Sequence, residues 1–149
     1  MTSGTALNIP AQAPRERPRV VLVVDDEPSM QTVLSRMLRL HGFDVHLANC
    51  SADAIALATI YRLDAAILDL GLKGQRSGLD VLAWFRSQST YAALPVLIFT
   101  GQVDLCEEVQ EAIKTHRAHV FHKPQPFSVL IDHLKQLFTS VPAEQESAA

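Results

Sequence analysis

The stretch VVLVVDDEP, residues 20–28, decides the fold. Val20–Val24 form a continuous apolar run rich in β-branched side chains, which is typical of a strand covered on both faces by helices. The carboxylates of Asp25 and Asp26 follow at once. Pro28 suits the first turn of a helix, because its ring fixes φ and its missing N–H is not needed there. The stretch therefore predicts a buried strand that ends in acidic residues and leads directly into a helix.

Three further strand-like runs each end beside a polar side chain. Asp69 follows Ala65–Leu68, Thr100 follows Pro95–Phe99, and Lys123 follows Ala118–His122. A shorter strand over Asp44–Leu47 is expected at one side of the sheet. Four of the predicted strands thus place a polar group at their carboxyl ends.

Helical patterns separate the strands. The predicted helices run from Pro28 to His41 with Gly42 at the C-cap, from Ser51 as the cap to about Leu63, from Gly78 to about Ser87, from Val103 to about His116, and from Phe127 onward. This alternation predicts an α/β fold, a doubly wound five-stranded parallel sheet in the order 2-1-3-4-5. Ligands bind such sheets beyond the carboxyl ends of the strands, where the strand order reverses. That point lies between strands one and three, so Asp25, Asp26 and Asp69 are expected to be neighbours.

The composition limits the class of protein. The chain has 149 residues, 48% of them hydrophobic, and a net charge of −3, which fits one globular domain and gives no electrostatic reason to expect nucleic-acid binding. No run approaches the roughly 20 apolar residues that span a bilayer, and residues 1–18 lack the apolar core of a signal peptide. We therefore expect a cytoplasmic protein. Cys50 and Cys106 are expected to be reduced, buried thiols.

The domain organisation is expected to be simple. Residues 1–18 are rich in proline and charge, and residues 141–149 read VPAEQESAA, so both segments are expected to be flexible tails. Residues 19–140 are expected to form the one functional domain, with no DNA-binding domain beside it.

Three carboxylates in one place require a neutralising partner. Two unit charges about 4 Å apart repel by roughly 4 kcal/mol at an effective dielectric constant near 20, so either the acids bind protons or a cation joins them. An all-oxygen, partly open site favours Mg²⁺. Taken singly, these acids are more often helix caps, and Lys123 and Thr100 are more often surface or turn residues. Their combination at four strand ends is what indicates a site.

The chemistry that fits this set is phosphoryl transfer. Asp69 has the best position for a nucleophile, since a carboxylate can attack phosphorus and form an acyl phosphate. The ammonium of Lys123 can pair with a phosphoryl oxygen as a compact charge, and the hydroxyl of Thr100 can donate to another.

The sequence resembles the receiver domain of response regulators in two-component signalling, in particular the single-domain chemotaxis type. The resemblance covers residues 19–140 and rests on residues 20–28, AAILDLGL at 65–72, SGLDVL at 77–82, PVLIFTG at 95–101 and the pair Lys123-Pro124. It implies a flavodoxin-like fold with Asp69 as the phosphoacceptor. It also implies that Asp26, Asp69 and the Gly71 carbonyl bind Mg²⁺, that Asp25 acts mainly through water, and that Thr100 and Lys123 contact the phosphoryl group.

Two loops depart from the family pattern. Lys73 stands where the family usually has proline, and the segment 74–77 looks about one residue too long. Gln125 and Pro126 separate the Lys-Pro pair from Phe127, which usually follows that pair directly. The family's Lys-Pro peptide bond is often cis, and we expect the same here.

Val120 is the departure with the largest consequence. Many receivers carry an aromatic residue at this position, and rotation of its ring reports phosphorylation. Phe121 is expected to face the other side of the sheet, because side chains alternate along a strand. We expect Thr100 to move toward the phosphoryl group, while the second half of the switch is weaker or built differently.

The resemblance implies a stand-alone response regulator. It would accept a phosphoryl group from a histidine kinase or a phosphotransfer protein, and it would catalyse only its own phosphorylation and dephosphorylation. The roughly −1.5 to −2 charge of the phosphoryl group would shift the face made by the fourth helix, the fifth strand and the last helix. Output is expected through a downstream protein effector, another relay protein or a homodimer formed through that face.

Three alternatives remain open at this point. A phosphatase of the haloacid dehalogenase type also uses an aspartate nucleophile and Mg²⁺, but its D-x-D-x-[TV] motif is missing after the first strand. A flavin-binding module would need a Ser/Thr/Gly-rich first loop, and two acids there would repel the phosphate of the flavin. A receiver that serves as a docking module without phosphorylation is the third alternative.

Overall fold

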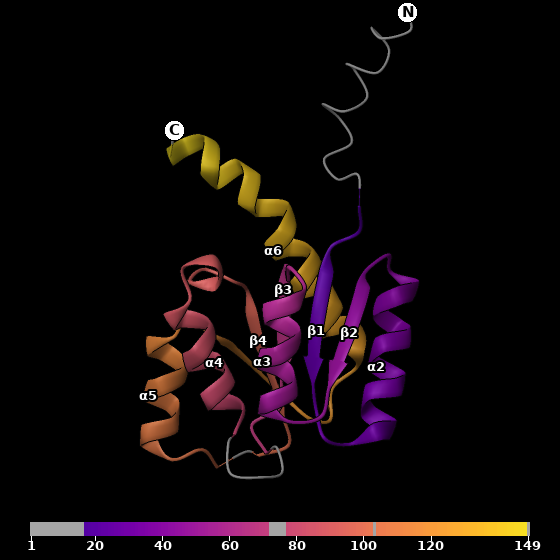
Figure 1. Cartoon of the computed structure of the whole chain (residues 1–149), viewed down its shortest axis with the longest axis vertical. Coiled ribbons are helices and arrows are strands. Elements are labelled where there is room, and N and C mark those ends of the chain that lie inside the picture. The colour runs from indigo at the N-terminus through magenta and orange to yellow at the C-terminus, as the bar shows by residue number, and fades with distance from the viewer. Residues whose placement is uncertain (1–16, 72–76, 103, 149) are drawn as a thin grey trace, which may run out of the picture.

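A computed structural model of the chain describes residues 17–71, 77–102 and 104–148 (Figure 1). The strands are β1 (Val20–Val24), β2 (Asp44–Ala48), β3 (Ala65–Leu68), β4 (Val96–Thr100) and β5 (His119–His122). The helices are α2 (Pro28–Leu40), α3 (Ser51–Ile60), α4 (Gly78–Ser87), α5 (Glu107–Thr115) and α6 (Phe127–Ala148), with a short 3-10 turn, η1, over Ser89–Tyr91. Strands and helices alternate along the chain, as predicted.

The strands form one parallel sheet in the order β2-β1-β3-β4-β5, which confirms the predicted topology. The register aligns the ends of the central strands, because Val24 lies opposite Ala48 on one side and Leu68 on the other. Thr100 and His122, the last residues of β4 and β5, also lie opposite each other. The five strands therefore finish together at the carboxyl end of the sheet, which is at the bottom of Figure 1.

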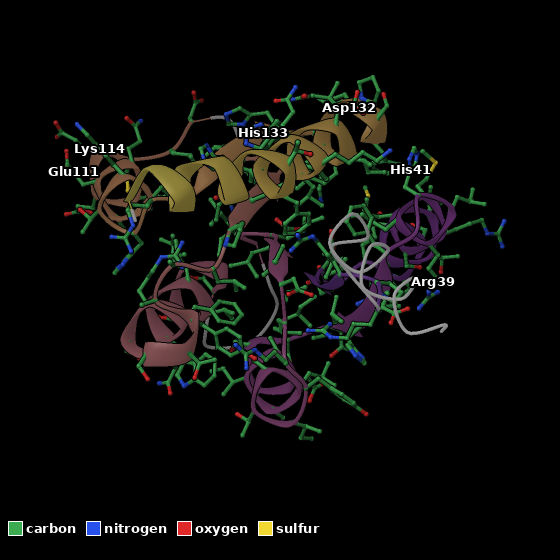
Figure 2. All side chains as sticks on the ribbon, turned by 90° about the horizontal axis from the view of Figure 1, so that it is seen from above. Arg39, His41, Glu111, Lys114, Asp132 and His133 are labelled. Carbon is green, nitrogen blue, oxygen red and sulfur yellow. The ribbon has the colours of Figure 1, made fainter. Side chains whose placement is uncertain are left out.

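Side chains of each strand enter two cores alternately. Leu22 and Val24 face the core covered by α3, α4 and α5, whereas Val21 and Val23 face the core covered by α2 and α6. Figure 2 looks down from the amino end of the sheet and shows α3 and α4 on one side of it and α6 on the other. Burial of one such aliphatic side chain stabilises the fold by about 1.5–3 kcal/mol. The sheet is therefore a firm platform for the residues at its carboxyl end.

Helix α3 differs from the prediction at both ends. Its N-cap is Cys50 and not Ser51: the Cys50 thiol accepts the Asp53 N–H at 3.5 Å, while Ser51 is the first helical residue and is buried. The helix ends at Ile60, three residues before the expected end. The Leu63 N–H donates to the Tyr91 hydroxyl at 3.2 Å, and this tertiary contact takes the place of another helical turn.

Helix α5 begins at Glu107, later than the predicted start at Val103, which lies outside the described residues. Cys106 is extended and serves as the N-cap, and Glu107 and Glu108 fill the first turn. Acidic side chains favour the positive end of the helix dipole, so the start coincides with these two glutamates.

The last helix and the cysteines also differ from expectation. Helix α6 continues through Ala148, so the backbone of residues 141–148, predicted as a tail, is helical. Neither cysteine is fully buried: Cys50 is half-buried and Cys106 is exposed, and both thiols are free as predicted. The amino-terminal tail lies outside the described residues up to position 16. Over the described residues, no helix is long and apolar enough to cross a bilayer.

Candidate functional site

The carboxyl end of the sheet brings the three predicted acids together. Asp25 and Asp26 follow β1 and Asp69 follows β3, and each offers one carboxylate oxygen that lies within 4.8 Å of the other two. The Asp69 N–H donates to the Val24 carbonyl at 2.9 Å, which continues the β1–β3 pairing up to the site. Residues 44 positions apart in the sequence become neighbours because parallel strands end at the same side.

Lys123 bridges two of these acids from the end of β5. Its ammonium lies 3.0 Å from Asp25 Oδ2 and 3.2 Å from Asp69 Oδ2. The backbone N–H of Lys123 donates to the Thr100 carbonyl at 2.7 Å, and its ammonium lies 5.4 Å from the centre of the Phe99 ring. These contacts hold the cation over the acidic cluster, where the sequence predicts it.

Asp25 is fixed by backbone contacts on both sides. Its carboxylate accepts the Glu27 N–H at 3.0 Å. The Gln31 amide donates to the carbonyls of Asp25 at 2.6 Å and of Ala48 at 2.9 Å, so α2 is tied to the ends of β1 and β2. Sequence reasoning did not identify Gln31, because one glutamine in the first turns of a helix carries no distinguishing signal.

Asp69 keeps limited access to solvent. Its side chain is 13% exposed, and Oδ1 accepts the Gly71 N–H at 3.1 Å while Oδ2 meets Lys123. Gly78, at the start of α4, passes directly over the Asp69 backbone: an added Cβ there would overlap the Asp69 carbonyl oxygen and lie 3.0 Å from its carbon. The glycine permits α4 to begin close to Asp69, and its role was not foreseen.

Burial and the neighbouring charges shift the pKa values of Asp25 and Lys123 in the cluster. Burial raises the pKa of Asp25, and the Glu27 N–H and Lys123 only partly offset that effect. Burial alone would lower the pKa of Lys123, but its hydrogen bond to Asp25 and the charges of Asp69 and Asp25 raise the pKa instead. The acids thus hold Lys123 in its charged form, while one cation does not fully compensate the buried Asp25.

The donor set fits Mg²⁺. Three carboxylates and one ammonium leave a formal charge of −2 at the cluster, which a divalent cation balances. The ligands are all oxygen, half-buried or buried, as hard cations require, with room for water at the partly exposed side. The Gly71 carbonyl stays a predicted ligand, and the loop predictions at Lys73 and 74–77 fall largely outside the described residues.

Thr100 ends β4 and is completely buried. Its hydroxyl accepts the Gln102 N–H at 3.1 Å, so in this state the side chain is engaged with its own loop. Its predicted contact with a phosphoryl oxygen stays a prediction. The Lys123-Pro124 peptide bond is cis, as expected from the resemblance.

Val120 leaves a hollow beside β5. Val120 packs toward the core of α3, α4 and α5 and Phe121 packs toward the opposite core, as strand alternation predicts. A cavity of about 250 Å³ lies between α5 and β5 and is lined by Leu105, Ile113 and Val120, with His122 beside them. Phe121 does not enter this cavity, so no ring of β5 replaces the one that many receivers carry.

The sequence matches the response regulator receiver domain family over residues 21–135. The chain belongs to this family. Receiver domains generally bind Mg²⁺ at an acidic pocket and interact with histidine kinases or phosphotransfer proteins, and this chain has an acidic cluster, formed by Asp25, Asp26 and Asp69.

Curated relatives are longer than this receiver. It is 42% identical over 86 residues to the probable transcriptional regulatory protein TcrX of Mycobacterium tuberculosis, a match that covers 58% of this chain and 36% of TcrX. It is 29% identical over 129 residues to the response regulator MprA of Mycobacterium ulcerans, covering 87% of this chain and 54% of MprA. The chain thus spans about a third to a half of the length of these relatives.

Solved structures of similar length support the same fold. The chemotaxis response regulator CheY4 of Vibrio cholerae superimposes with a TM-score of 0.71 at 28% identity, over 80% of this chain and 98% of CheY4. A CheY-like receiver domain protein from Methanospirillum hungatei gives a TM-score of 0.74 at 20% identity, over 89% of this chain and 99% of that one. The second likeness concerns the fold alone.

Proposed function

We propose that this receiver accepts a phosphoryl group on Asp69 from a phosphohistidine of a histidine kinase or phosphotransfer protein. The position of Asp69 carries the proposal. Its carboxylate belongs to a cluster of three, lies 3.2 Å from the Lys123 ammonium, and keeps 13% of its side chain exposed to an approaching donor. Asp25 is too buried, at 6% side-chain exposure, to be reached as easily.

In the proposed reaction, a carboxylate oxygen of Asp69 attacks phosphorus opposite the P–N bond of the donor. That bond breaks, and the donor imidazole keeps the electron pair and takes up a proton. Mg²⁺, when bound by Asp25, Asp26 and Asp69, supplies positive charge that balances the phosphoryl oxygens. Lys123 already reaches Asp69 and can transfer its hydrogen bond to a phosphoryl oxygen without a large movement.

The added charge is the proposed signal. It draws Lys123 away from Asp25 and offers an acceptor to the Thr100 hydroxyl, which in its own loop accepts the Gln102 N–H. Lys123 directly follows β5 and Thr100 ends β4, so their movement reaches the face formed by α5, β5 and α6. A downstream protein, another relay protein or a second copy of the chain would recognise that face.

Intact-mass measurement with acetyl phosphate and Mg²⁺ tests the proposal. We expect the wild-type chain to gain one phosphoryl group that is lost at extremes of pH, as acyl phosphates are, and Asp69→Asn to gain none. Asp132→Asn, which removes an exposed carboxylate on α6 (Figure 2), should be labelled like the wild type. Equal labelling of the wild type and Asp69→Asn would refute the assignment, and an unlabelled wild type would favour a docking module that works without phosphorylation.

A further inference from the structure

A second pocket lies at the amino end of the sheet, opposite the acidic cluster. It has a volume of about 340 Å³ and is formed by the end of α3, the end of α4 and the turn η1. In Figure 1 the ends of these two helices lie at the top, whereas the strands β1 and β2 run toward the bottom. A volume of this size is within the range of small-molecule sites, roughly 300–1,000 Å³.

Aromatic rings form much of the pocket wall. Tyr61, Trp84 and Tyr91 all line it. Tyr61 is 45% exposed and stacks on His46 with 4.1 Å between ring centroids, while Trp84 packs against Tyr91 at 6.3 Å. The neighbouring Ile60 is 70% exposed at the same rim. These surfaces offer apolar area and ring faces to a flat, aromatic ligand.

Three backbone carbonyls beside the pocket already have side-chain partners. The Tyr91 hydroxyl donates to the carbonyls of Ala58 at 2.8 Å and Tyr61 at 2.9 Å, which end α3. The Tyr91 carbonyl accepts from Arg86 at 3.2 Å. The Tyr91 hydroxyl thus occupies the carbonyls of Ala58 and Tyr61 at the end of α3.

The charge around the pocket is positive. Arg62 lines it and is exposed, Arg86 binds the carbonyl of Tyr91, and Arg117 donates to the Ala92 carbonyl at 2.9 Å. Across the described residues, no carboxylate forms an ion pair with any of these three arginines. Burial, followed by the charge of the nearby Arg117, lowers the pKa of Arg86. No acidic residue lines the pocket itself.

We propose that this pocket binds a small planar aromatic carboxylate, with the ring against Trp84 and Tyr61 and the carboxylate paired with Arg62. Arg62 is the residue that can turn its guanidinium toward the ligand, because Arg86 and Arg117 are engaged with backbone carbonyls. The site is separate from the phosphoryl-acceptor cluster and needs no phosphorylation to form. It would give the receiver a small-molecule input besides its kinase.

Trp84 makes the proposal directly measurable, since it is the single tryptophan of the chain. Titration with 2-naphthoate is expected to change its fluorescence with a saturable curve, and calorimetry should give the same dissociation constant. The neutral isostere 2-naphthamide should bind about tenfold more weakly, because it lacks the charge that Arg62 recognises. Equal affinity for the two compounds, or no saturation by naphthoate, would overturn the proposal.

Three variants complete the test. Arg62→Gln is expected to weaken naphthoate binding about tenfold and to leave naphthamide binding unchanged. Arg36→Gln removes the same charge from an exposed position on α2 and should bind naphthoate like the wild type; an equal loss in both variants would overturn the site. Asp69→Asn should bind naphthoate like the wild type, so failure of the phosphoryl-acceptor assignment leaves this result unaffected.

Discussion

At the scale of single residues, Lys123 is the residue on which the acidic cluster depends. Its ammonium is the one cation that bonds both Asp25 and Asp69 among the contacts of the described residues, and its side chain is only 17% exposed. Its charge is maintained by those same acids, which raise its pKa against the effect of burial. Lys123 and the two carboxylates therefore stabilise each other.

Lys123→Ala tests this dependence. Without Mg²⁺ the variant leaves two half-buried or buried acids unpaired, so we expect its free energy of unfolding to fall by about 1–3 kcal/mol. Labelling by acetyl phosphate should persist, while the conformational response of β5 should be reduced. Urea unfolding measures the change in the free energy of unfolding. Lys114→Ala, at an exposed site on α5 (Figure 2), serves as the control, and an equal loss in both variants would contradict the bridging role.

Gly78 controls the approach of α4 to Asp69. A methyl group at this position meets the Asp69 carbonyl oxygen and lies 3.3 Å from the Leu70 Cα, so the backbone of Asp69 must shift. We expect Gly78→Ala to cost about 1–3 kcal/mol of stability, as overpacking does, and to slow labelling of Asp69. Gly101→Ala is the matched control, because nothing lies within 4 Å of its added Cβ. Normal labelling and stability in Gly78→Ala would show that the contact relaxes without consequence.

At the scale of elements, the strands were easier to predict than the helix ends. β1 and β3 are uninterrupted apolar runs because both faces are buried, and their predicted bounds agree with the structure. The end of α3 was misplaced because it is fixed by the contact between Leu63 and Tyr91, residues 28 positions apart in the sequence. Asp25, Asp69 and Lys123 were found because strand ends mark them, whereas Gln31 and Gly78 act through tertiary contacts that no local pattern announces.

The packing of β5 on α6 contains a pH-sensitive contact. His133 lies on α6 (Figure 2), and its ring centroid is 4.8 Å from that of His119 and 5.2 Å from that of Phe121. The Nε2 atom of His133 is buried and has no hydrogen-bond partner. Burial, followed by the charge of His119, lowers the pKa of His133. The unfolded chain therefore binds a proton near pH 6.5 that the folded chain takes up only at lower pH.

We expect this histidine to make the fold less stable in mild acid. The stability that the neutral form of His133 contributes is fully present above about pH 6.5. It is lost as the pH falls through the lowered pKa of the folded state, by at most about 1.4 kcal/mol per pH unit. Between pH 7 and 5, His133→Gln should remove the contribution of this histidine to the slope of the free energy of unfolding against pH. His119→Gln should reduce that contribution. Urea unfolding at several pH values measures the slope, and an unchanged slope in His133→Gln would exclude the contact as its source.

At the scale of the whole molecule, the two ends of the sheet carry opposite charge. The carboxyl end gathers acids that need a cation, while the amino end gathers arginines around aromatic rings. The parallel topology produces this separation, because β1, β3, β4 and β5 all end beside the acidic cluster, while α3 and α4 lead the chain back to the amino end, where their last residues line the pocket. Between them, the cavity beside Val120 leaves α5 less tightly packed on β5 than an aromatic side chain there would.

Removal of Mg²⁺ should lower the free energy of unfolding of the whole domain. A ligand that binds only the folded state stabilises it by RT ln(1 + [L]/Kd), which is about 1.4 kcal/mol at ten times Kd. We therefore expect excess Mg²⁺ to stabilise the wild type against urea relative to EDTA, and Asp26→Asn to lose most of that gain.

Asp25→Asn should behave differently from the wild type both with and without Mg²⁺. In EDTA the variant should be more stable than the wild type, because it removes a carboxylate that is costly to ionise where it is buried. It should also gain less stability from Mg²⁺. Asp132→Asn should respond like the wild type. If Mg²⁺ raises the free energy of unfolding of Asp26→Asn and Asp25→Asn as much as that of the wild type, the ion binds elsewhere. The charge of the cluster must then be balanced by Lys123 and bound protons alone.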